Sequence, residues 1–381
     1  MMNADPPGTR PARHAVFHPL RVERLEKLTD DAVAVTFEVP DELTESYAFL
    51  PGQHVTVRTE AAGDDLRRNY SICTPWSDSG SETFRIGVKR VVGGGFSAYA
   101  LERMRVGDVV EVMTPTGRFS VIPDQRHSRH LCCVAAGSGI TPILSIIASV
   151  LAVEPHSTIT LLYGNRTTRS IMFLEELADL KDRYPGRFHL VHVLSREEPD
   201  VELLGGRIDG PKLQLFLDTL LPPVDEWYLC GPMLMVDELR KVLRGQGVPR
   251  ERLHSELFHV GPSAPLVEGG RQDGAATASA AAAQADQAAA CEVTAIMDGR
   301  RSTFRLARHG APVLEGVLAV RGDAPFACRG GVCGTCRAKV IEGAAVMDHC
   351  YALEPDEVAR GYILTCQAHP SGDRLVIDYD A

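Results

Sequence analysis

The chain has 381 residues, a net charge of −10, an apolar fraction of 44% and a charged fraction of 24%. This length exceeds the ~100–200 residues of one domain and predicts two or three. No apolar run approaches the roughly 18 residues of a membrane span, and the negative charge argues against a nucleic-acid partner. The N-terminus lacks the succession of a signal peptide, so we expect a cytoplasmic protein with few disulfides.

Residues 16–125 contain short alternating segments at 33–39, 54–57, 84–89 and 108–112, separated by turn signals. This spacing predicts a small antiparallel β-barrel.

Two motifs in this barrel region are candidate ligand contacts. Arg68-Asn69-Tyr70-Ser71 lies in a predicted strand, whose alternation would put the arginine and the tyrosine on one face. There the ring can lie against a planar cofactor and the guanidinium can meet a phosphate, although such a pair is also typical of an ordinary surface. Gly93-Gly94-Gly95-Phe96-Ser97 precedes a predicted helix over 98–104 and makes an anion-binding helix start.

From residue 126 to 260 the pattern changes to buried apolar runs that alternate with helical segments. Strands are expected at 131–136, 158–163, 188–194 and 227–230, and helices at 141–151 and 173–182. This order predicts an α/β domain with a parallel sheet of the nucleotide-binding type.

Two motifs in this α/β region would line one cleft. Gly137-Ser138-Gly139-Ile140-Thr141-Pro142 follows the first strand and opens a helix, whose free amides suit a pyrophosphate. Many such turns are only tight connections. Cys230-Gly231-Pro232 ends a later strand, at the carboxyl edge where open α/β sheets bind their ligands.

Residues 261–290 are rich in glycine, proline and alanine and have no apolar periodicity, which predicts a flexible linker. As a coil it would span about 30 Å, less if the alanine-rich half is partly helical. Residues 291–381 then have the size of a small ferredoxin.

Four cysteines in this last region follow the spacing C-x4-C-x2-C with a distant fourth, the ligand pattern of a plant-type [2Fe–2S] ferredoxin. They are Cys328, Cys333, Cys336 and Cys366. Glycines between the first three let the backbone curl around a cluster, and the apolar run 362–366 would return the fourth to this loop. A zinc site, or four buried thiols, are the alternatives. The remaining cysteines outside the motifs are expected to be small buried side chains: Cys73, Cys132, Cys133, Cys291 and Cys350.

The motifs of residues 16–259 resemble those of the ferredoxin–NADP reductase superfamily. They match its R-x-Y-S, G-x-G-x-T-P and C-G-P motifs, and Glu256-Leu257-Phe258 is similar to its closing acidic-x-aromatic element. The resemblance implies a FAD-binding barrel, an NAD(P)-binding α/β domain and, with the cysteines, a β-grasp ferredoxin domain.

The resemblance also implies roles for individual residues. Tyr70 would pack on the isoalloxazine, Ser71 would lie near its N5, Cys230 would face the nicotinamide, and Phe258 would shield the flavin. Ser71, Cys230 and Glu256 would form the catalytic set. The other implied contacts are, for FAD, Arg68, Asn69, Val88, Lys89, Gly95, Phe96 and Ser97, and for the nucleotide, Gly137, Ser138, Gly139, Thr141, Pro142, Gly231 and Pro232.

The choice of nucleotide depends on the 2′-phosphate, which arginine accommodates and an acidic residue disfavours. Arg166 follows the second sheet strand, and Ser195-Arg196 follows the third. These residues favour NADPH, whereas Glu197 and Glu198 leave NADH open.

A reductase joined to a C-terminal ferredoxin is typical of oxygenase reductases, and this chain most resembles the reductase subunits of phenylacetyl-CoA epoxidases. The resemblance implies electron transfer from NADPH through FAD and the cluster to a multicomponent diiron monooxygenase of phenylacetate catabolism. No diiron ligand motif is evident in the chain itself, so oxygen activation would belong to another subunit. A reductase for an aromatic-ring hydroxylase or a fatty-acid desaturase, or a redox carrier without enzymatic activity, are the alternatives.

Overall fold

The computed structural model describes residues 16–59, 66–77, 80–199, 201–259, 290–308 and 310–381. They belong to two compact units, one formed by the described residues of 17–259 and the other by those from 290 onward. The predicted linker over 261–290 lies outside the described residues except for Ala290, which is the first residue of a strand.

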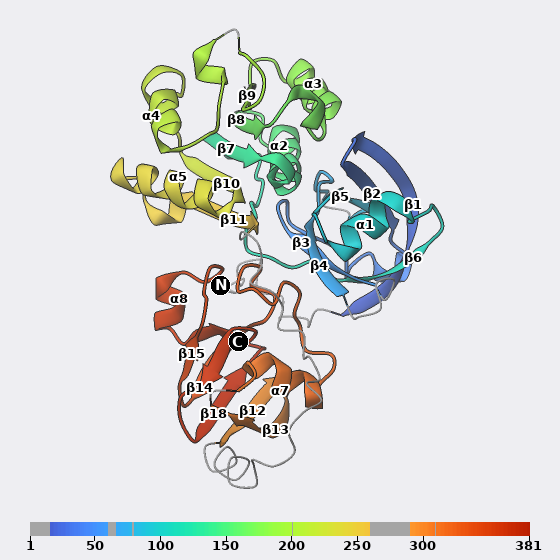
Figure 1. Cartoon of the computed structure of the whole chain (residues 1–381). Helices are drawn as coiled ribbons and strands as arrows, with labels where there is room; N and C mark the ends of the chain where they lie inside the picture. Colours follow the sequence, from blue (N-terminus) through green and yellow to red (C-terminus); the bar gives the residue numbers. More distant parts are fainter. Residues whose placement is uncertain (1–15, 60–65, 78–79, 200, 260–289, 309) are drawn as a thin grey trace, which may run out of the picture. The chain divides into compact units, whose positions relative to one another are not determined.

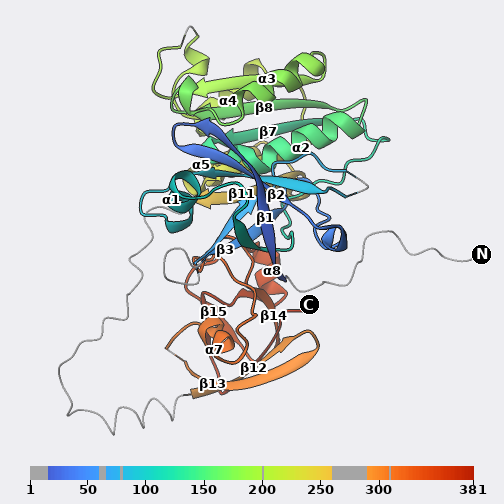
Figure 2. The same cartoon turned by 90° about the vertical axis from the view of Figure 1, so that its right-hand side faces the viewer.

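The first unit begins with an antiparallel sheet of strand order β4-β3-β6-β1-β2-β5 (Figures 1 and 2). Ile72, directly after β4, bridges to Ile86 of β5, so the two edges of the sheet meet and close a barrel. Its interior is filled by alternate apolar side chains, as expected for strands with one buried face. The strands are β1 (Phe17–Thr29), β2 (Ala32–Glu38), β3 (His54–Thr59), β4 (Leu66–Ser71), β5 (Thr83–Lys89) and β6 (Val109–Met113).

A short helix, α1 (Gly95–Glu102), follows β5. The predicted helix began at residue 98, so the prediction was wrong by one turn: Gly95, Phe96 and Ser97 form the first turn instead of preceding it. Gly94 serves as the N-cap with an extended backbone, so the glycine run ends the loop and starts the helix.

The second part of this unit is a five-stranded parallel sheet of order β11-β10-β7-β8-β9. The three central strands of this sheet, β10, β7 and β8, are buried on both faces, which explains their continuous apolar runs. Helices α2 and α3 pack on one face, and α4 and α5 on the other (Figure 1). The elements are β7 (His130–Ala136), α2 (Ile140–Val153), β8 (Thr158–Asn165), α3 (Leu174–Arg183), β9 (Phe188–Leu194), α4 (Gly210–Thr219), β10 (Glu226–Pro232), α5 (Met233–Gly245) and β11 (Leu253–His259).

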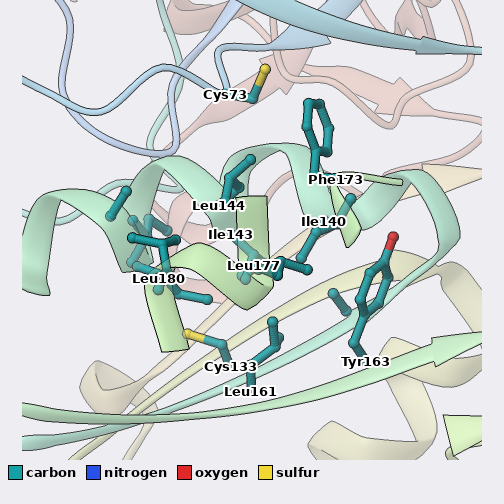
Figure 3. Packing of buried hydrophobic residues seen from close by; sticks show 14 of the residues in the cluster. Cys73, Cys133, Ile140, Ile143, Leu144, Leu161, Tyr163, Phe173, Leu177 and Leu180 are labelled. Carbon is teal, nitrogen blue, oxygen red and sulfur yellow. The ribbon is translucent and has the colours of Figure 1, made fainter. Parts of the chain in front are cut away.

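The barrel and the parallel sheet share one apolar core. Ile140, Ile143 and Leu144 of α2 lie between the sheet and Cys73, which follows β4 of the barrel (Figure 3). Arg85 of β5 also donates to both carboxylate oxygens of Glu176 on α3, at 2.8 and 2.6 Å. Apolar burial and this ion pair, in which one guanidinium nitrogen serves both carboxylate oxygens, hold the two halves of the unit together.

The second unit contains a mixed sheet of order β13-β12-β18-β14-β16, with the helix α7 packed on it, and a small sheet of β15 and β17. The parallel central pair β12 and β18 is flanked by antiparallel neighbours, an α+β arrangement. The elements are β12 (Ala290–Met297), β13 (Arg300–Ala307), α7 (Val313–Val320), β14 (Arg337–Glu342), β15 (Ala345–Met347), α8 (Pro355–Ala359), β16 (Tyr362–Leu364), β17 (Ala368–Pro370) and β18 (Arg374–Asp378).

Two details of this unit differ from the sequence prediction. Strand β16 ends at Leu364, so Cys366 lies in the turn after it and not within the strand. Cys350 is half-buried, whereas Cys73, Cys132, Cys133 and Cys291 are fully buried as expected.

Candidate functional site

The R-x-Y-S motif lies on β4 and turns its residues to alternate sides. Arg68 is exposed and Tyr70 is half-buried on the same side, while the Asn69 amide oxygen accepts a hydrogen bond from Thr56 on β3 at 2.8 Å. The Tyr70 ring lies 5.2 Å from the ring of Phe96, which is buried in α1. The fold therefore brings the predicted flavin-stacking residue to the glycine-rich helix start.

The glycine loop before α1 offers open backbone. Gly93 has φ +73°, and a Cβ added there would meet nothing within 4 Å. The Ser97 hydroxyl is buried and shapes the loop, because it accepts from the Val91 amide at 3.1 Å and donates to the Gly94 carbonyl at 3.1 Å. A cradle of this kind fits a phosphate group held by backbone amides.

Two further residues of the predicted flavin site have other partners. Val88 is buried in the same apolar cluster as Phe96. The Lys89 ammonium lies 3.6 Å from the Asp31 carboxylate and donates to the Ser170 carbonyl at 3.4 Å. Neither side chain contacts Tyr70 through a described hydrogen bond or ring contact.

The predicted catalytic residues meet although they are far apart in sequence. The Ser71 hydroxyl donates to Glu256 Oε2 at 3.2 Å, across 185 positions of the chain. The other oxygen, Oε1, lies 3.6 Å from Nδ1 of His54, which sequence reasoning missed. His54 is the register partner of Ser71 on the neighbouring strand, a pairing that the sequence could have indicated only once the strands were aligned.

Cys230 joins this group from β10, where it is paired with Glu256 of β11. Burial, and then the Glu256 carboxylate, raise the pKa of the Cys230 thiol well above its usual value, which keeps it neutral. Gly139 packs so closely here that an added Cβ would lie 2.3 Å from the Cys230 carbonyl oxygen. The G-x-G turn and the C-G-P motif are therefore in direct contact, with Pro232 exposed at the strand end.

The turn before α2 has open space in which an anion could bind. Gly137 has φ +55° and open space where a Cβ would stand. Its carbonyl accepts from the Tyr163 hydroxyl at 2.9 Å, and the Thr141 hydroxyl donates to the Ser138 carbonyl at 3.1 Å. No side chain caps the N-terminus of α2, although the Ile140 amide donates to the Gly137 and Ser138 carbonyls, so a nucleotide pyrophosphate would meet the positive end of the helix dipole here. Pro142 is buried in the first turn.

The two arginines proposed for nucleotide choice lie on adjacent loops after β8 and β9. The Arg196 amide donates to the Arg166 carbonyl at 2.8 Å, and the Ser195 amide donates to the Asn165 carbonyl at 3.0 Å. Both arginines are exposed. The Glu197 carboxylate is engaged by Thr168, whose amide and hydroxyl each donate to it at 2.8 Å.

Phe258 lies near the end of β11 and is half-buried against the core shared by the barrel and the parallel sheet. The described residues show no ring contact between Phe258 and Tyr70. Its expected role as a flavin shield stays a prediction.

The cysteine loop runs from Cys328 to Cys336, between α7 and β14, and its backbone is strongly curled. Arg329, Gly331 and Gly334 have φ of 53°, 74° and 70°. A Cβ on Gly331 would lie 2.9 Å from the His349 carbonyl, so only glycine fits there without a shift. The Gly330 amide donates to the Cys328 sulfur at 3.4 Å, as in a cluster loop whose amides face sulfur ligands.

The four thiols approach one another in two pairs. The Cys333 thiol donates to Cys328 and lowers the pKa of Cys328 to about 5, and Cys336 lowers the pKa of Cys366 in the same way. Among the residues that the structure describes, no three His, Cys, Asp or Glu side chains converge on one metal position. The partners in each pair, Cys333 and Cys336, have their pKa raised well above the usual value by these same hydrogen bonds and by burial. Two close cysteine pairs suit two irons better than one tetrahedral zinc, so the donor set fits a [2Fe–2S] cluster.

Three family models match successive parts of the chain. The oxidoreductase FAD-binding domain matches residues 19–121, the oxidoreductase NAD-binding domain 133–241, and the 2Fe-2S iron-sulfur cluster binding domain 296–371. A 1,2-phenylacetyl-CoA epoxidase subunit from Escherichia coli (strain K12) is 42% identical over 367 residues, which cover 96% of this chain and 98% of the relative. The chain belongs to the family of oxygenase reductases that includes this relative. This oxygenase reductase is therefore an FAD- and pyridine-nucleotide-dependent iron–sulfur oxidoreductase that transfers electrons to an oxygenase.

A second relative and one solved structure each match most of the oxygenase reductase. The ferredoxin reductase component of 3-ketosteroid-9-alpha-monooxygenase from Rhodococcus rhodochrous is 30% identical and covers 94% of this chain and 96% of its own. The structure of phthalate dioxygenase reductase has the same fold, with a TM-score of 0.54 at 22% identity over 95% of this chain and 98% of its own. No helix among the described residues is long and apolar enough to cross a membrane.

Proposed function

We propose that this reductase oxidises NADPH and supplies electrons to the diiron oxygenase of a phenylacetyl-CoA 1,2-epoxidase, in phenylacetate catabolism. The 42% identity to a component of such an enzyme over nearly the whole of both chains carries this proposal. The relatives of this reductase serve oxygenases, and its described residues offer no oxygen-activating site. It therefore requires a partner that binds the substrate.

The preference for NADPH is supported by the loops after β8 and β9. Arg166 and Arg196 lie on backbone segments that are hydrogen-bonded to each other, so two guanidinium groups share one edge of the sheet. Glu197, the acidic residue that would favour NADH, is held by two hydrogen bonds from Thr168. A 2′-phosphate at this edge would meet positive charge, with Ser195 as an additional donor.

At the flavin site, Tyr70 would stack on the isoalloxazine and Arg68 would contact the pyrophosphate, which Gly95, Phe96 and Ser97 would hold from the start of α1. Asn69, Val88 and Lys89 would shape the surroundings.

When bound, FAD accepts a hydride and releases electrons singly. Ser71 would lie near the reacting nitrogen while its hydroxyl donates to Glu256, and buried Cys230 would exclude water beside the nicotinamide.

The domain boundaries that accompany this proposal are 16–125 for FAD, 126–260 for the nucleotide, 261–290 for the linker and 291–381 for the cluster. Cys328, Cys333, Cys336 and Cys366 would hold the cluster, which carries single electrons to the oxygenase.

Anaerobic titration of the purified protein with NADPH, and separately with NADH, tests the donor. We expect the flavin and iron–sulfur absorption bands to bleach at far lower NADPH than NADH. Equal bleaching by NADPH and NADH would contradict the argument that Arg166 and Arg196 favour NADPH. A flavin band that is absent or never bleaches would favour the redox carrier over the reductase.

A second candidate acceptor is a steroid monooxygenase, because the 3-ketosteroid-9-alpha-monooxygenase reductase matches 94% of the chain at 30% identity. Reconstitution distinguishes the two. The reduced protein is mixed with the oxygenase subunits of either enzyme, and product is measured. Turnover with the steroid oxygenase alone would overturn the proposed acceptor.

A further inference from the structure

His54 is a buried histidine at the start of β3 that none of the sequence motifs includes. It is 5% exposed, and its backbone amide and carbonyl are both hydrogen-bonded to Thr116 at 2.9 Å. A Cβ added to Gly117 would lie 2.9 Å from its Nδ1, so the loop after β6 presses directly on the imidazole. The ring therefore has little freedom to turn.

One carboxylate connects this histidine to the predicted catalytic serine. Glu256 reaches from β11, accepts from the Ser71 hydroxyl through Oε2, and places Oε1 3.6 Å from His54 Nδ1. A small movement of the glutamate closes the second distance to a hydrogen bond. Arg118, next to Gly117, is exposed, and neutral Cys230 is the register partner of Glu256.

The other ring nitrogen of His54, Nε2, is buried without a hydrogen-bond partner. An unpartnered buried polar atom of this kind is destabilising and requires an explanation. An apolar residue would fill the same space without that cost, so the interaction that the imidazole makes through Nδ1 is the reason to have a histidine here.

We infer that His54 is a positioning residue for the flavin reaction: its imidazole holds the Glu256 carboxylate in the orientation in which the Ser71 hydroxyl can donate to it. The inference rests on the proposed function, because it concerns the same site. Oxidation of NADPH releases two electrons and one proton, and the cluster takes only the electrons. A proton must therefore leave the flavin site in each turnover, and a correctly oriented Ser71–Glu256 pair gives it an acceptor.

This role is tested by two substitutions, which differ in the ring nitrogen of His54 that they imitate. In His54→Asn the amide nitrogen stands near the position of Nδ1, and in His54→Gln it stands near Nε2; neither side chain titrates. We expect His54→Asn to keep the rate of flavin reduction by saturating NADPH within about threefold in anaerobic stopped-flow, and His54→Gln to lose up to about a hundredfold. His18→Leu, a change at a barrel histidine that contacts Tyr47, is the control and should leave the rate unchanged.

Two further measurements separate positioning from a merely structural role. In a Glu256→Gln background, His54→Gln should cause no further loss, because the carboxylate it acts through is gone. In protein labelled with ¹⁵N-histidine, the ring signals assigned to His54 should report a protonated Nδ1 that shifts in Glu256→Gln. Equal rates for the asparagine and glutamine variants, or additive losses with Glu256→Gln, would overturn the inference. A wild-type flavin that NADPH never reduces would instead overturn the proposed function, and this inference with it.

Discussion

Replacing Gly139 by alanine places a methyl group against the backbone of β10. Gly139 has φ −60° and ψ −7°, which alanine adopts without strain, so backbone preference alone predicts a gain of about 0.4–1 kcal/mol. The added Cβ, however, would lie 2.3 Å from the Cys230 carbonyl oxygen and 2.7 Å from its carbon, where real Cβ atoms stay beyond 3.0 Å. The turn and the strand must therefore separate by about 0.7 Å.

Overpacking of this kind costs about 1–3 kcal/mol, which exceeds the entropic gain. From the middle of both ranges, about 2 against about 0.7 kcal/mol, the net loss is about 1.3 kcal/mol, which should lower the melting temperature by about 3–5 °C and weaken nucleotide binding. Differential scanning calorimetry and nucleotide titration measure both. Gly186→Ala is the matched control for stability: its Cβ would meet nothing within 4 Å and its backbone is not left-handed, so the melting temperature should not fall. A melting temperature of Gly139→Ala at or above wild type would refute the reasoning.

Three further changes have defined outcomes. Cys336→Ser should abolish reduction of cytochrome c through the cluster and leave flavin reduction by NADPH intact; loss of both would contradict two separable modules. Arg196→Ala should raise the KM for NADPH severalfold and leave the KM for NADH unchanged, as steady-state kinetics can check. The His254 imidazole, 3.3 Å away, and then Arg129 lower the pKa of Glu226 to about 2. This depressed pKa stabilises the fold above the unfolded value near 4.5. Glu226→Gln should thus cost about 2 kcal/mol at pH 7, with the difference shrinking as the pH falls towards 2 in urea denaturation.

The features that could be predicted from the sequence are local ones. The turn at Gly137–Gly139 follows an apolar strand and opens a helix, and all three elements are contiguous in the chain. The alternating sequence patterns within β2 and within β5, and the spacing of the cluster cysteines, are equally short-range signals. Even here the predicted start of α1 was wrong by one turn, because Gly95 can start a helix as readily as it can end a loop.

The features that could not be predicted depend on register between distant strands. His54 faces Ser71 only because β3 pairs with β4 in one register, and Glu256 reaches both because β11 pairs with β10 at the far edge of another sheet. No short pattern marks a histidine that follows Pro-Gly-Gln as a neighbour of a glutamate 202 positions later. The lone imidazole is indistinguishable from a core histidine until the sheets are assembled.

The cysteine loop is held in its curled shape by contacts with the rest of its domain. Left-handed backbone at a side-chain-bearing residue such as Arg329 costs about 1–2 kcal/mol, and the loop has two left-handed glycines besides. Protein groups support this shape: Gln367 donates to the Arg329 carbonyl at 2.8 Å, and the amides of Tyr351 and Ala352 donate to the Gly331 carbonyl at 3.0 and 3.1 Å. Because these contacts come from the segments around β16 and before α8, the packed domain fixes the loop with its amides towards sulfur. The fold therefore supports the loop in the curled shape that suits a cluster held by these cysteines.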